Sequence, residues 1–324
     1  MELDGNEDAL EVDLNLAQYL KYWLDLYGEE YLEASTLSQY RGMVCNHIPD
    51  ALGKTRLVEI TPIQVLNLLR HKSRLGYSKS TVARIHIILR RALGHAVRWG
   101  LLEHNPADVL PVKGTNPAAG LAYLEPAAIG PYLDAARDYR HYPIIFTALQ
   151  TGMRQGELLA LRHRDVGEDR ITVRRALKRT VDGVLYFGPP KSASSYRTVP
   201  ISHRNQSVLC RWIERQREEL GAVTVAAEME RIFFTTGGGK PVHPRNLLRT
   251  HYRVLERAGL ARIPFHGLRH THATMLLGSG IHPKVVAERL GHASIRVTLD
   301  TYSHVLPSLQ WGLVERLDEM IDRT

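Results

Sequence analysis

The sequence predicts a mainly α-helical chain, in which an N-terminal helical bundle precedes a mixed α/β domain that is mostly helical with a small antiparallel sheet. Apolar residues recur at helical spacing through the first third of the chain, and short β-prone runs with turn signals follow between residues 171 and 201. A stretch rich in Pro, Gly and Asn separates the two regions. A length of 324 residues with 44% hydrophobic content is sufficient for two domains of this kind.

The N-terminal bundle is expected to span residues 14–107. Residues 1–13 carry acidic side chains and no Lys or Arg, so we expect them to form a flexible tail. Apolar side chains at helical spacing over residues 16–27 predict the first helix. Two capping boxes, Thr-Leu-Ser-Gln at 36–39 and Thr-Pro-Ile-Gln at 61–64, predict the starts of two more helices.

A fourth helix is expected from about Lys79 to Trp99. Its residues Arg84, Arg91 and His95 are spaced i, i+7 and i+11, on the side opposite the apolar positions. We expect these three side chains to share one exposed face that contacts phosphates. The alternative is an ordinary solvated helix face, which is common in basic proteins.

A connector at residues 108–123 is expected to lead into a second domain at 124–324. There, an apolar helix over residues 142–150 runs straight into Thr-Gly-Met-Arg, so Arg154 is expected at a helix start. Beyond Pro307, apolar residues recur along a charged helix. This last helix is predicted to dock either on a neighbouring protomer or on its own domain.

Three short runs in the second domain predict β-strands. Ile171-Thr-Val-Arg-Arg and Val184-Leu-Tyr-Phe are expected to be joined through the turn pair Asp182-Gly183, and Arg197-Thr-Val-Pro-Ile follows as a third strand. Lys191 then falls on the loop between the second and third strands. By itself it would be an unremarkable exposed loop lysine.

The charge balance points to an acidic partner. Lys and Arg total 42 against 34 Asp and Glu, for a net charge of +8, and the isoelectric point is about 9.5, which favours an acidic polymer such as nucleic acid. Charge alone is equally consistent with a merely solvated basic surface. No apolar run approaches the roughly 20 residues of a membrane helix, and the acidic N-terminus does not match a secretory signal. The protein is therefore expected in the cytoplasm, without a membrane partner.

No metal site is predicted. Cys45 and Cys210 are far apart and lie beside hydrophobic residues, so we expect buried thiols in place of a disulfide or a ligand pair. The histidines near the C-terminus lack a supporting Cys pair or a His-Glu-x-x-His spacing. The Gly-rich stretch at 236–240 does not match a phosphate-binding loop.

A scattered series of basic side chains ending in a phenol is the main functional signal. Two arginines, one lysine and two histidines can together stabilise the negative charge that gathers on a phosphoryl group under attack. Each residue alone is weak evidence, but their order and conjunction are specific. In chain order they are Arg154, Lys191, His266, Arg269, His292 and Tyr302.

These residues and their spacing resemble the tyrosine recombinase (phage integrase) family. That family has the boxes Thr-Gly-x-Arg-x-x-Glu-Leu, His-x-x-Arg-His and Leu-Gly-His before a nucleophilic Tyr, and every position is filled here. The similarity runs from about Leu14 to Tyr302. It implies a core-binding, SAM-like helical DNA-binding domain at 14–107 and a catalytic domain at 124–324 that ends in a docking helix.

The resemblance also implies the chemistry of the nucleophile and its phosphate. Tyr302 is expected to attack a DNA phosphorus and form a 3′-phosphotyrosyl intermediate. Arg154 and Arg269 are expected to hold the two non-bridging oxygens. Glu157, one turn after Arg154, matches the acidic position of the family and is expected to orient neighbouring cations.

The remaining roles follow from the same resemblance. His266 is expected to help take the phenolic proton, His292 to donate a hydrogen bond to the phosphate, and Lys191 to protonate the departing 5′-oxygen. No cofactor is implied. The implied partners are double-stranded DNA and a homotetramer on paired DNA sites, with accessory DNA-bending proteins as further candidates.

Several functions fit these features. The first is a site-specific recombinase or integrase of a prophage or mobile element, and the second is a chromosome-dimer resolvase of the same family. The segment before the bundle is too short for the arm-site domain of many integrases, which raises the resolvase alternative somewhat. A type IB topoisomerase and a non-catalytic DNA-binding regulator are alternatives from other classes.

Overall fold

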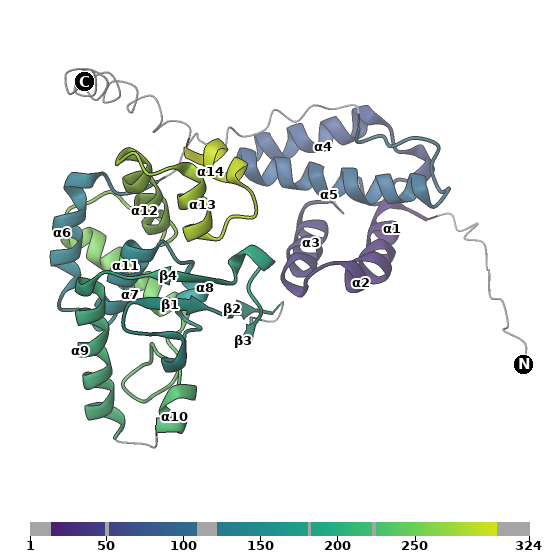
Figure 1. Cartoon of the computed structure of the whole chain (residues 1–324). Coiled ribbons are helices and arrows are strands. Elements are labelled where there is room, and N and C mark those ends of the chain that lie inside the picture. The colour runs from purple at the N-terminus through teal and green to yellow at the C-terminus, as the bar shows by residue number, and fades with distance from the viewer. Residues whose placement is uncertain (1–13, 49–51, 109–121, 181–182, 222–224, 303–324) are drawn as a thin grey trace, which may run out of the picture. The chain divides into compact units, whose positions relative to one another are not determined.

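The computed structural model shows a mainly helical chain that divides into two compact units (Figure 1). The N-terminal unit comprises residues 1–116 with 179–184, and the C-terminal unit comprises the remainder. The predicted fold class is therefore confirmed. The residues that the structure describes are 14–48, 52–108, 122–180, 183–221 and 225–302. The predicted acidic tail, most of the predicted connector and the predicted C-terminal docking helix lie outside these described residues.

The N-terminal unit is a helical bundle around one apolar core. Its helices are α1 (Leu16–Trp23), α2 (Glu29–Tyr31), α3 (Ala34–His47), α4 (Pro62–Arg74) and α5 (Lys79–Arg98), with a π-helical segment, Leu24–Gly28, between α1 and α2. Two buried aromatic residues of α1 form hydrogen bonds with α5. The Tyr19 hydroxyl donates a hydrogen bond to the Ala92 carbonyl at 2.6 Å, and the Trp23 indole N–H donates to His95 Nδ1 at 3.1 Å.

One of the two predicted capping boxes is present. Thr61 caps α4, its side chain bonds reciprocally with Gln64, and Pro62 occupies the first turn. The prediction at Thr36 is wrong, because α3 begins at Ala34 after an extended Glu33. The helix start is therefore set upstream of the capping motif, and Thr36 lies inside the first turn.

The expectation of one exposed cationic face on α5 is wrong for two of its three residues. His95 is buried against Trp23, and this burial lowers its pKa. Arg91 is half-buried: its Nη2 donates to the Tyr27 hydroxyl at 2.6 Å. Of the three, only Arg84 is exposed. Aromatic residues from α1 and the π-helical segment pack over this side of α5, a contact that helical spacing alone does not reveal.

The C-terminal unit is a layered assembly of helices with two short strand pairs. Its helices are α6 (Pro126–Ala136), α7 (Tyr142–Thr151), α8 (Gln155–Leu158), α9 (His203–Leu220), α10 (Val225–Glu230), α11 (Pro244–Arg257), α12 (Gly267–Gly278), α13 (Pro283–Leu290) and α14 (Ile295–Tyr302). Its strands are β1 (Arg170–Val173), β2 (Ala176–Arg179), β3 (Leu185–Gly188) and β4 (Arg197–Pro200).

The strand pairing differs from the prediction. β1 pairs antiparallel with β4, placing buried Ile171 opposite buried Val199, and β2 pairs with β3. The turn before β3 therefore joins it to β2, not to β1. The sequence of β2, Ala-Leu-Lys-Arg, has no apolar alternation, so the strand was missed and its partner was misassigned.

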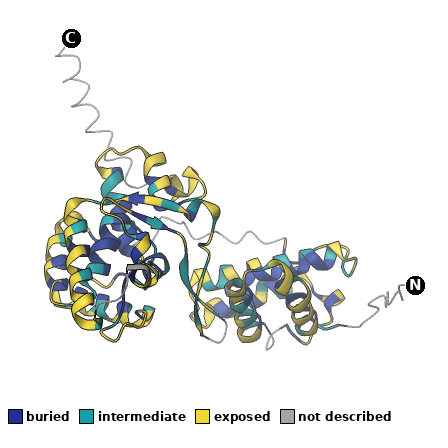
Figure 2. Cartoon of the chain, turned by 60° about the horizontal axis from the view of Figure 1, so that its bottom comes forward, coloured by how far each residue is buried: buried dark blue, intermediate teal, exposed yellow. Residues whose placement is uncertain are grey.

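Helix α7 lies at the centre of the C-terminal core. Every residue from Ile144 to Leu149 is buried, and the helix packs against α6, α9 and α12. Figure 2 shows this arrangement as buried ribbon inside the unit and exposed ribbon around it. Since α7 is rigidly enclosed, the chain that leaves its C-terminal end starts from a fixed position.

Two further expectations concern the surface. Cys45 and Cys210 are both exposed, so the prediction of buried thiols is wrong. Each lies on the outer side of an amphipathic helix whose apolar neighbours face inward. Of the helices described, none is both long enough and apolar enough to cross a bilayer.

A pair of adjacent isoleucines tests the orientation of α5. Ile88 is fully buried, whereas Ile87 is 57% exposed. We expect Ile88→Ala to lower the free energy of unfolding by about 2–5 kcal/mol, because it leaves a cavity in the bundle core. The matched control Ile87→Ala should change it by less than about 0.5 kcal/mol. Denaturant unfolding followed by tryptophan fluorescence measures both, and equal losses would contradict the packing described for α5.

Candidate active site

The end of helix α7 positions Arg154. The helix stops at Gly152, whose φ of +65° is a left-handed conformation that favours glycine. Two residues later, Arg154 adopts an extended conformation and becomes the N-terminal cap of α8. Its Nη1 donates to Glu157 Oε1 at 2.8 Å, and its backbone N–H donates to Glu157 Oε2 at 3.0 Å.

Glu157 joins two arginines beneath the site. Its side chain is 2% exposed, and Arg197 Nη2 donates to its Oε2 at 2.9 Å. Burial by itself would raise the pKa of Glu157, but the hydrogen bond and charge of Arg197, with the charge of Arg154, outweigh it and lower the pKa. Arg197 was missed as a site residue. The available signal was its position at the start of β4, just after the Lys191 loop.

Arg269 is a buried cation with one unused donor. It lies in α12, is 3% exposed, and its Nη1 donates to the Gly152 carbonyl at 2.8 Å. Its Nη2 has no hydrogen-bond partner among the described residues. Burial, followed by the charge of Arg154, lowers the pKa of Arg269 to about 9, which leaves it protonated at neutral pH. A buried charged donor without a partner lowers the stability of the fold unless a bound ligand accepts its hydrogen bond.

Two predicted histidines border these arginines. His292 directly follows Gly291, whose carbonyl accepts from Arg154 Nη2 at 3.3 Å, and His292 Nδ1 lies 2.7 Å from Thr298 Oγ1. Burial and the nearby arginines lower the pKa of His292 to about 3, so its imidazole is neutral. His266 is exposed and occupies the N-cap position of α12 without a side-chain capping bond.

Tyr302 ends helix α14 with its hydroxyl inside the protein. The residue is 1% exposed, and its Oη lies 2.7 Å from His270 Nδ1. Burial raises the pKa of Tyr302 to about 12, although the charge of Arg269 opposes this rise. His270 was not predicted as a site residue, even though it is the last residue of the His-Gly-Leu-Arg-His box.

Lys191 is placed where the sequence predicted, on the loop between β3 and β4. It is exposed and forms no hydrogen bond or ion pair with the described residues. The structure thus gathers Arg154, Glu157 and Arg269, places Tyr302 where the charge of Arg269 acts on it, and leaves Lys191 on the surface of its loop. No group of three or more potential metal-ligating side chains occurs within the part of the chain that is described.

Comparisons with known proteins identify the family of the chain. A model of the phage integrase family matches residues 125–308, which include Arg154, Arg269 and Tyr302. The chain belongs to the phage integrase family. Its members are tyrosine-type site-specific recombinases. A second model, described as phage integrase, N-terminal SAM-like domain, matches residues 15–73.

Relatives of this recombinase include proteins of bacteria and their mobile elements. A tyrosine recombinase XerC-like protein of Caldanaerobacter subterraneus subsp. tengcongensis is 29% identical, over 98% of this chain and 87% of that protein. The ICEBs1 integrase of Bacillus subtilis is 26% identical, over 86% of this chain and 76% of that protein.

Solved integrase structures share the fold of this recombinase. The Tn1549 transposon integrase in complex with a circular intermediate DNA has a TM-score of 0.78 at 21% identity, over 94% of this chain and 99% of that one. A lambda integrase tetramer bound to a Holliday junction has a TM-score of 0.65 at 19% identity, over 88% of this chain and 76% of that one.

A second hydrogen-bond network of the recombinase holds the end of α7 in place. Arg289 Nε donates to His272 Nε2 at 3.0 Å, and its Nη2 donates to the carbonyls of Gln150 and Pro200. His272 Nδ1 in turn lies 2.9 Å from the Leu149 carbonyl. Because His272 Nε2 accepts a hydrogen bond from Arg289, the ring proton is on Nδ1, which donates to the Leu149 carbonyl. These bonds connect the C-terminal end of α7 to α12, α13 and β4.

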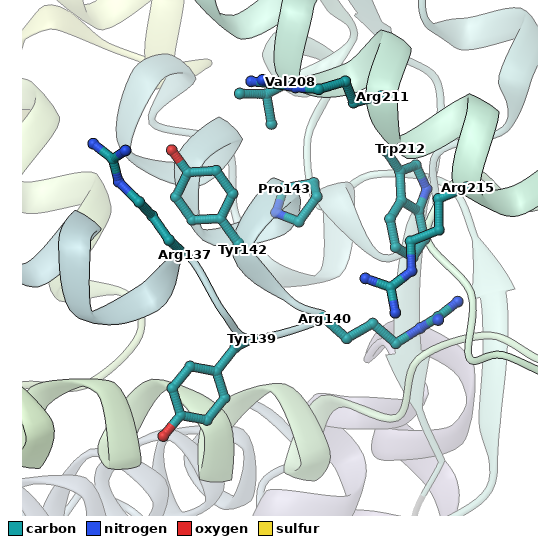
Figure 3. Close-up of a pocket in the computed structure, with 9 residues that line it drawn as sticks. All are labelled: Arg137, Tyr139, Arg140, Tyr142, Pro143, Val208, Arg211, Trp212 and Arg215. Carbon is teal, nitrogen blue, oxygen red and sulfur yellow. The ribbon is translucent and has the colours of Figure 1, made fainter.

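The basic cavity in Figure 3 is separate from this site. It is lined by Arg137, Tyr139, Arg140, Tyr142, Pro143, Val208, Arg211, Trp212 and Arg215. Arg140 donates to both carboxylate oxygens of Glu219 at 2.6 Å and lies over the Trp212 ring. The cavity adjoins the N-terminal end of α7, about 15 Å along the helix from the end that leads to Arg154.

Replacing Gly152 tests how tightly the end of α7 is constrained. A Cβ at this position would lie 2.5 Å from Leu290 Cδ2 and 2.7 Å from His272 Cδ2. We expect Gly152→Ala to destabilise the C-terminal unit by several kcal/mol, combining about 1–2 kcal/mol of backbone strain with the cost of the clash. Thermal unfolding measures this loss.

A matched control for Gly152 exists in the same unit. Gly259 has a φ of +67°, and a Cβ there would meet nothing within 4 Å. Gly259→Ala should therefore show the backbone strain alone, about 1–2 kcal/mol. If both variants lost the same stability, the close packing of Leu290 and His272 around Gly152 would be refuted.

Proposed function

We propose that this protein is a site-specific recombinase of a prophage or mobile element, which cuts and rejoins double-stranded DNA through a 3′-phosphotyrosyl intermediate. The observation that carries the proposal is the unused Nη2 donor of buried Arg269, which acts electrostatically on both Arg154 and Tyr302. A DNA phosphate at this position would satisfy that donor and accept hydrogen bonds from both guanidiniums.

The proposed cleavage is an in-line displacement at phosphorus. Tyr302 Oη forms a bond to phosphorus while the bond to the 5′-oxygen breaks, and Lys191 donates a proton to that oxygen. Arg154 and Arg269 bind the non-bridging oxygens, whose negative charge grows in the transition state. Rejoining is the reverse reaction, in which a 5′-hydroxyl attacks the phosphotyrosyl ester. Each step exchanges one phosphate ester for another, so no nucleotide hydrolysis is needed.

The remaining proposed site residues act around this phosphate. His292 donates a hydrogen bond to it, and Glu157 holds Arg154 in position through the paired contacts described above. His266 borders the phosphate from the exposed start of α12. The phenolic proton, expected from the sequence to pass to His266, is not assigned to it, because the hydrogen bond with Tyr302 Oη is formed by His270.

The proposed partners are double-stranded DNA and three further copies of the chain. The net charge of +8 favours a polyanion. The lambda integrase bound to a Holliday junction is a tetramer, and the Tn1549 integrase was captured with a circular intermediate DNA. Accessory DNA-bending proteins remain a proposal from the family resemblance. The XerC-like relative favours a dimer resolvase as the second candidate; sequencing recombination junctions from cells distinguishes these two roles.

Replacing the nucleophile tests the reaction class. With a suicide substrate nicked beside the crossover, the wild type is expected to accumulate a covalent protein–DNA band, because the cleaved strand diffuses away before it can be rejoined. Tyr302→Phe should give no such band while it retains DNA binding in a gel-shift assay. If neither protein formed an adduct, a non-catalytic DNA-binding regulator would be indicated. If both formed one, the nucleophile would be a residue other than Tyr302.

Exposed Arg84 is the remaining candidate phosphate contact on α5. We expect Arg84→Ala to weaken DNA binding and to reduce the slope of log affinity against log salt by about 0.9, the value for one lost phosphate contact. The control Arg90→Ala removes the same charge from another face of the same helix, where Arg90 is paired with Asp108. Equal effects of the two variants would mean that only net charge matters.

A further inference from the structure

The side chain in contact with the reacting oxygen is His270. Its Nδ1 lies 2.7 Å from Tyr302 Oη, and the two ring centroids are 5.7 Å apart. Among the described residues, no other side chain forms a hydrogen bond with that hydroxyl. His270 directly follows Arg269 in α12, so the same helix turn presents a cation for the phosphate and an imidazole for the nucleophile.

The imidazole of His270 is available as a base. Burial and the charge of Arg269 lower its pKa to about 4, so the ring is neutral at pH 7 and has one free lone pair. With its proton on Nε2, the ring presents the Nδ1 lone pair to the phenol. Tyr302 needs such an acceptor, because a phenol with a pKa near 12 is ionised in only about one molecule in 10⁵ at pH 7.

The other two imidazoles of the site are less suited to this step. His292 Nδ1 is engaged by Thr298 Oγ1 at 2.7 Å. Burial lowers the pKa of His266 to about 4, as it does for His270, so position decides between the two. The His266 ring centroid lies 4.8 Å from that of His270, nearly perpendicular to it. His266 therefore contacts the face or edge of His270, and His270 contacts the phenol.

We propose that His270 is a catalytic residue that accepts the Tyr302 proton during cleavage and returns it during rejoining. The inference rests on the proposed phosphotyrosyl chemistry and deepens it. In cleavage, the phenolic proton moves to His270 Nδ1 as the Oη–phosphorus bond forms, and the 5′-oxygen leaves with a proton from Lys191. In rejoining, the 5′-hydroxyl returns its proton to Lys191, and the departing phenolate recovers its proton from His270.

A change of leaving group separates this role from that of Lys191. The test uses the full chain and two nicked suicide substrates, one with the ordinary 5′-oxygen and one with sulfur at the bridging 5′ position. A thiolate leaves without protonation, so the sulfur substrate removes the need for an acid and keeps the need for a base. We expect His270→Gln to slow adduct formation by about 10²–10⁴-fold on both substrates. Lys191→Ala should be slow on the oxygen substrate alone.

A more acidic phenol provides the second measurement. Replacement of Tyr302 by 3,5-difluorotyrosine lowers the need for a base, so the rate lost in His270→Gln should shrink in that background. A purely structural role for His270 would leave the loss unchanged. This comparison also holds if His270→Gln lowers stability. The cleavage rates with tyrosine and with difluorotyrosine are then both measured in proteins that carry His270→Gln.

Controls and contrary outcomes are distinct. His203→Gln, an exposed histidine of α9 outside the site, should cleave both substrates at the wild-type rate. The inference is overturned if His270→Gln cleaves normally, if sulfur restores its rate, or if difluorotyrosine leaves its defect unchanged. Absence of any adduct from the wild type would instead refute the proposed recombinase chemistry itself.

Discussion

The buried carboxylate of Glu157 is the interaction on which the site depends. Guanidinium groups that share a water-poor region repel one another, and they remain there only if a counter-charge is held among them. Glu157 provides it by bonding Arg154 and Arg197 at the same time. Its single negative charge offsets part of the positive charge of these two arginines and by itself raises the pKa of Arg269, which stays buried and charged with one donor unused. The positive field of these side chains is therefore built into the fold, as the proposed binding of a DNA phosphate requires.

Backbone geometry fixes where these charged side chains lie. The left-handed Gly152 turns the chain out of α7, and its carbonyl accepts from Arg269, so one residue links the segments that carry Arg154 and Arg269. Arg289 and His272 hold the same helix end from the other side. Such rigidity suits a mechanism based on preorganised donors, because a displaced guanidinium would stabilise the transition state less well.

Much of the fold was predictable from local patterns. Helices with a clear apolar stripe or a proline-containing cap, such as those beginning at Leu16 and Pro62, were found because their signals are contained within a few residues. Strand β2 was missed because its short run has no alternation. The aromatic cover over Arg91 and His95 was missed because it comes from α1 and the π-helical segment, more than sixty positions earlier in the chain.

The sequence by itself determined the chemical inventory: the family, the ordered Arg, Lys, His and Tyr residues, and the helical class, because these depend on residue type and short-range spacing. Only the tertiary structure decided which groups meet. Arg197 joined the site through a carboxylate forty positions away, and His270 displaced His266 as the neighbour of Tyr302. Both outcomes depend on how α12, α14 and β4 pack, and packing brings together residues whose separation along the chain gives no sign of their contact.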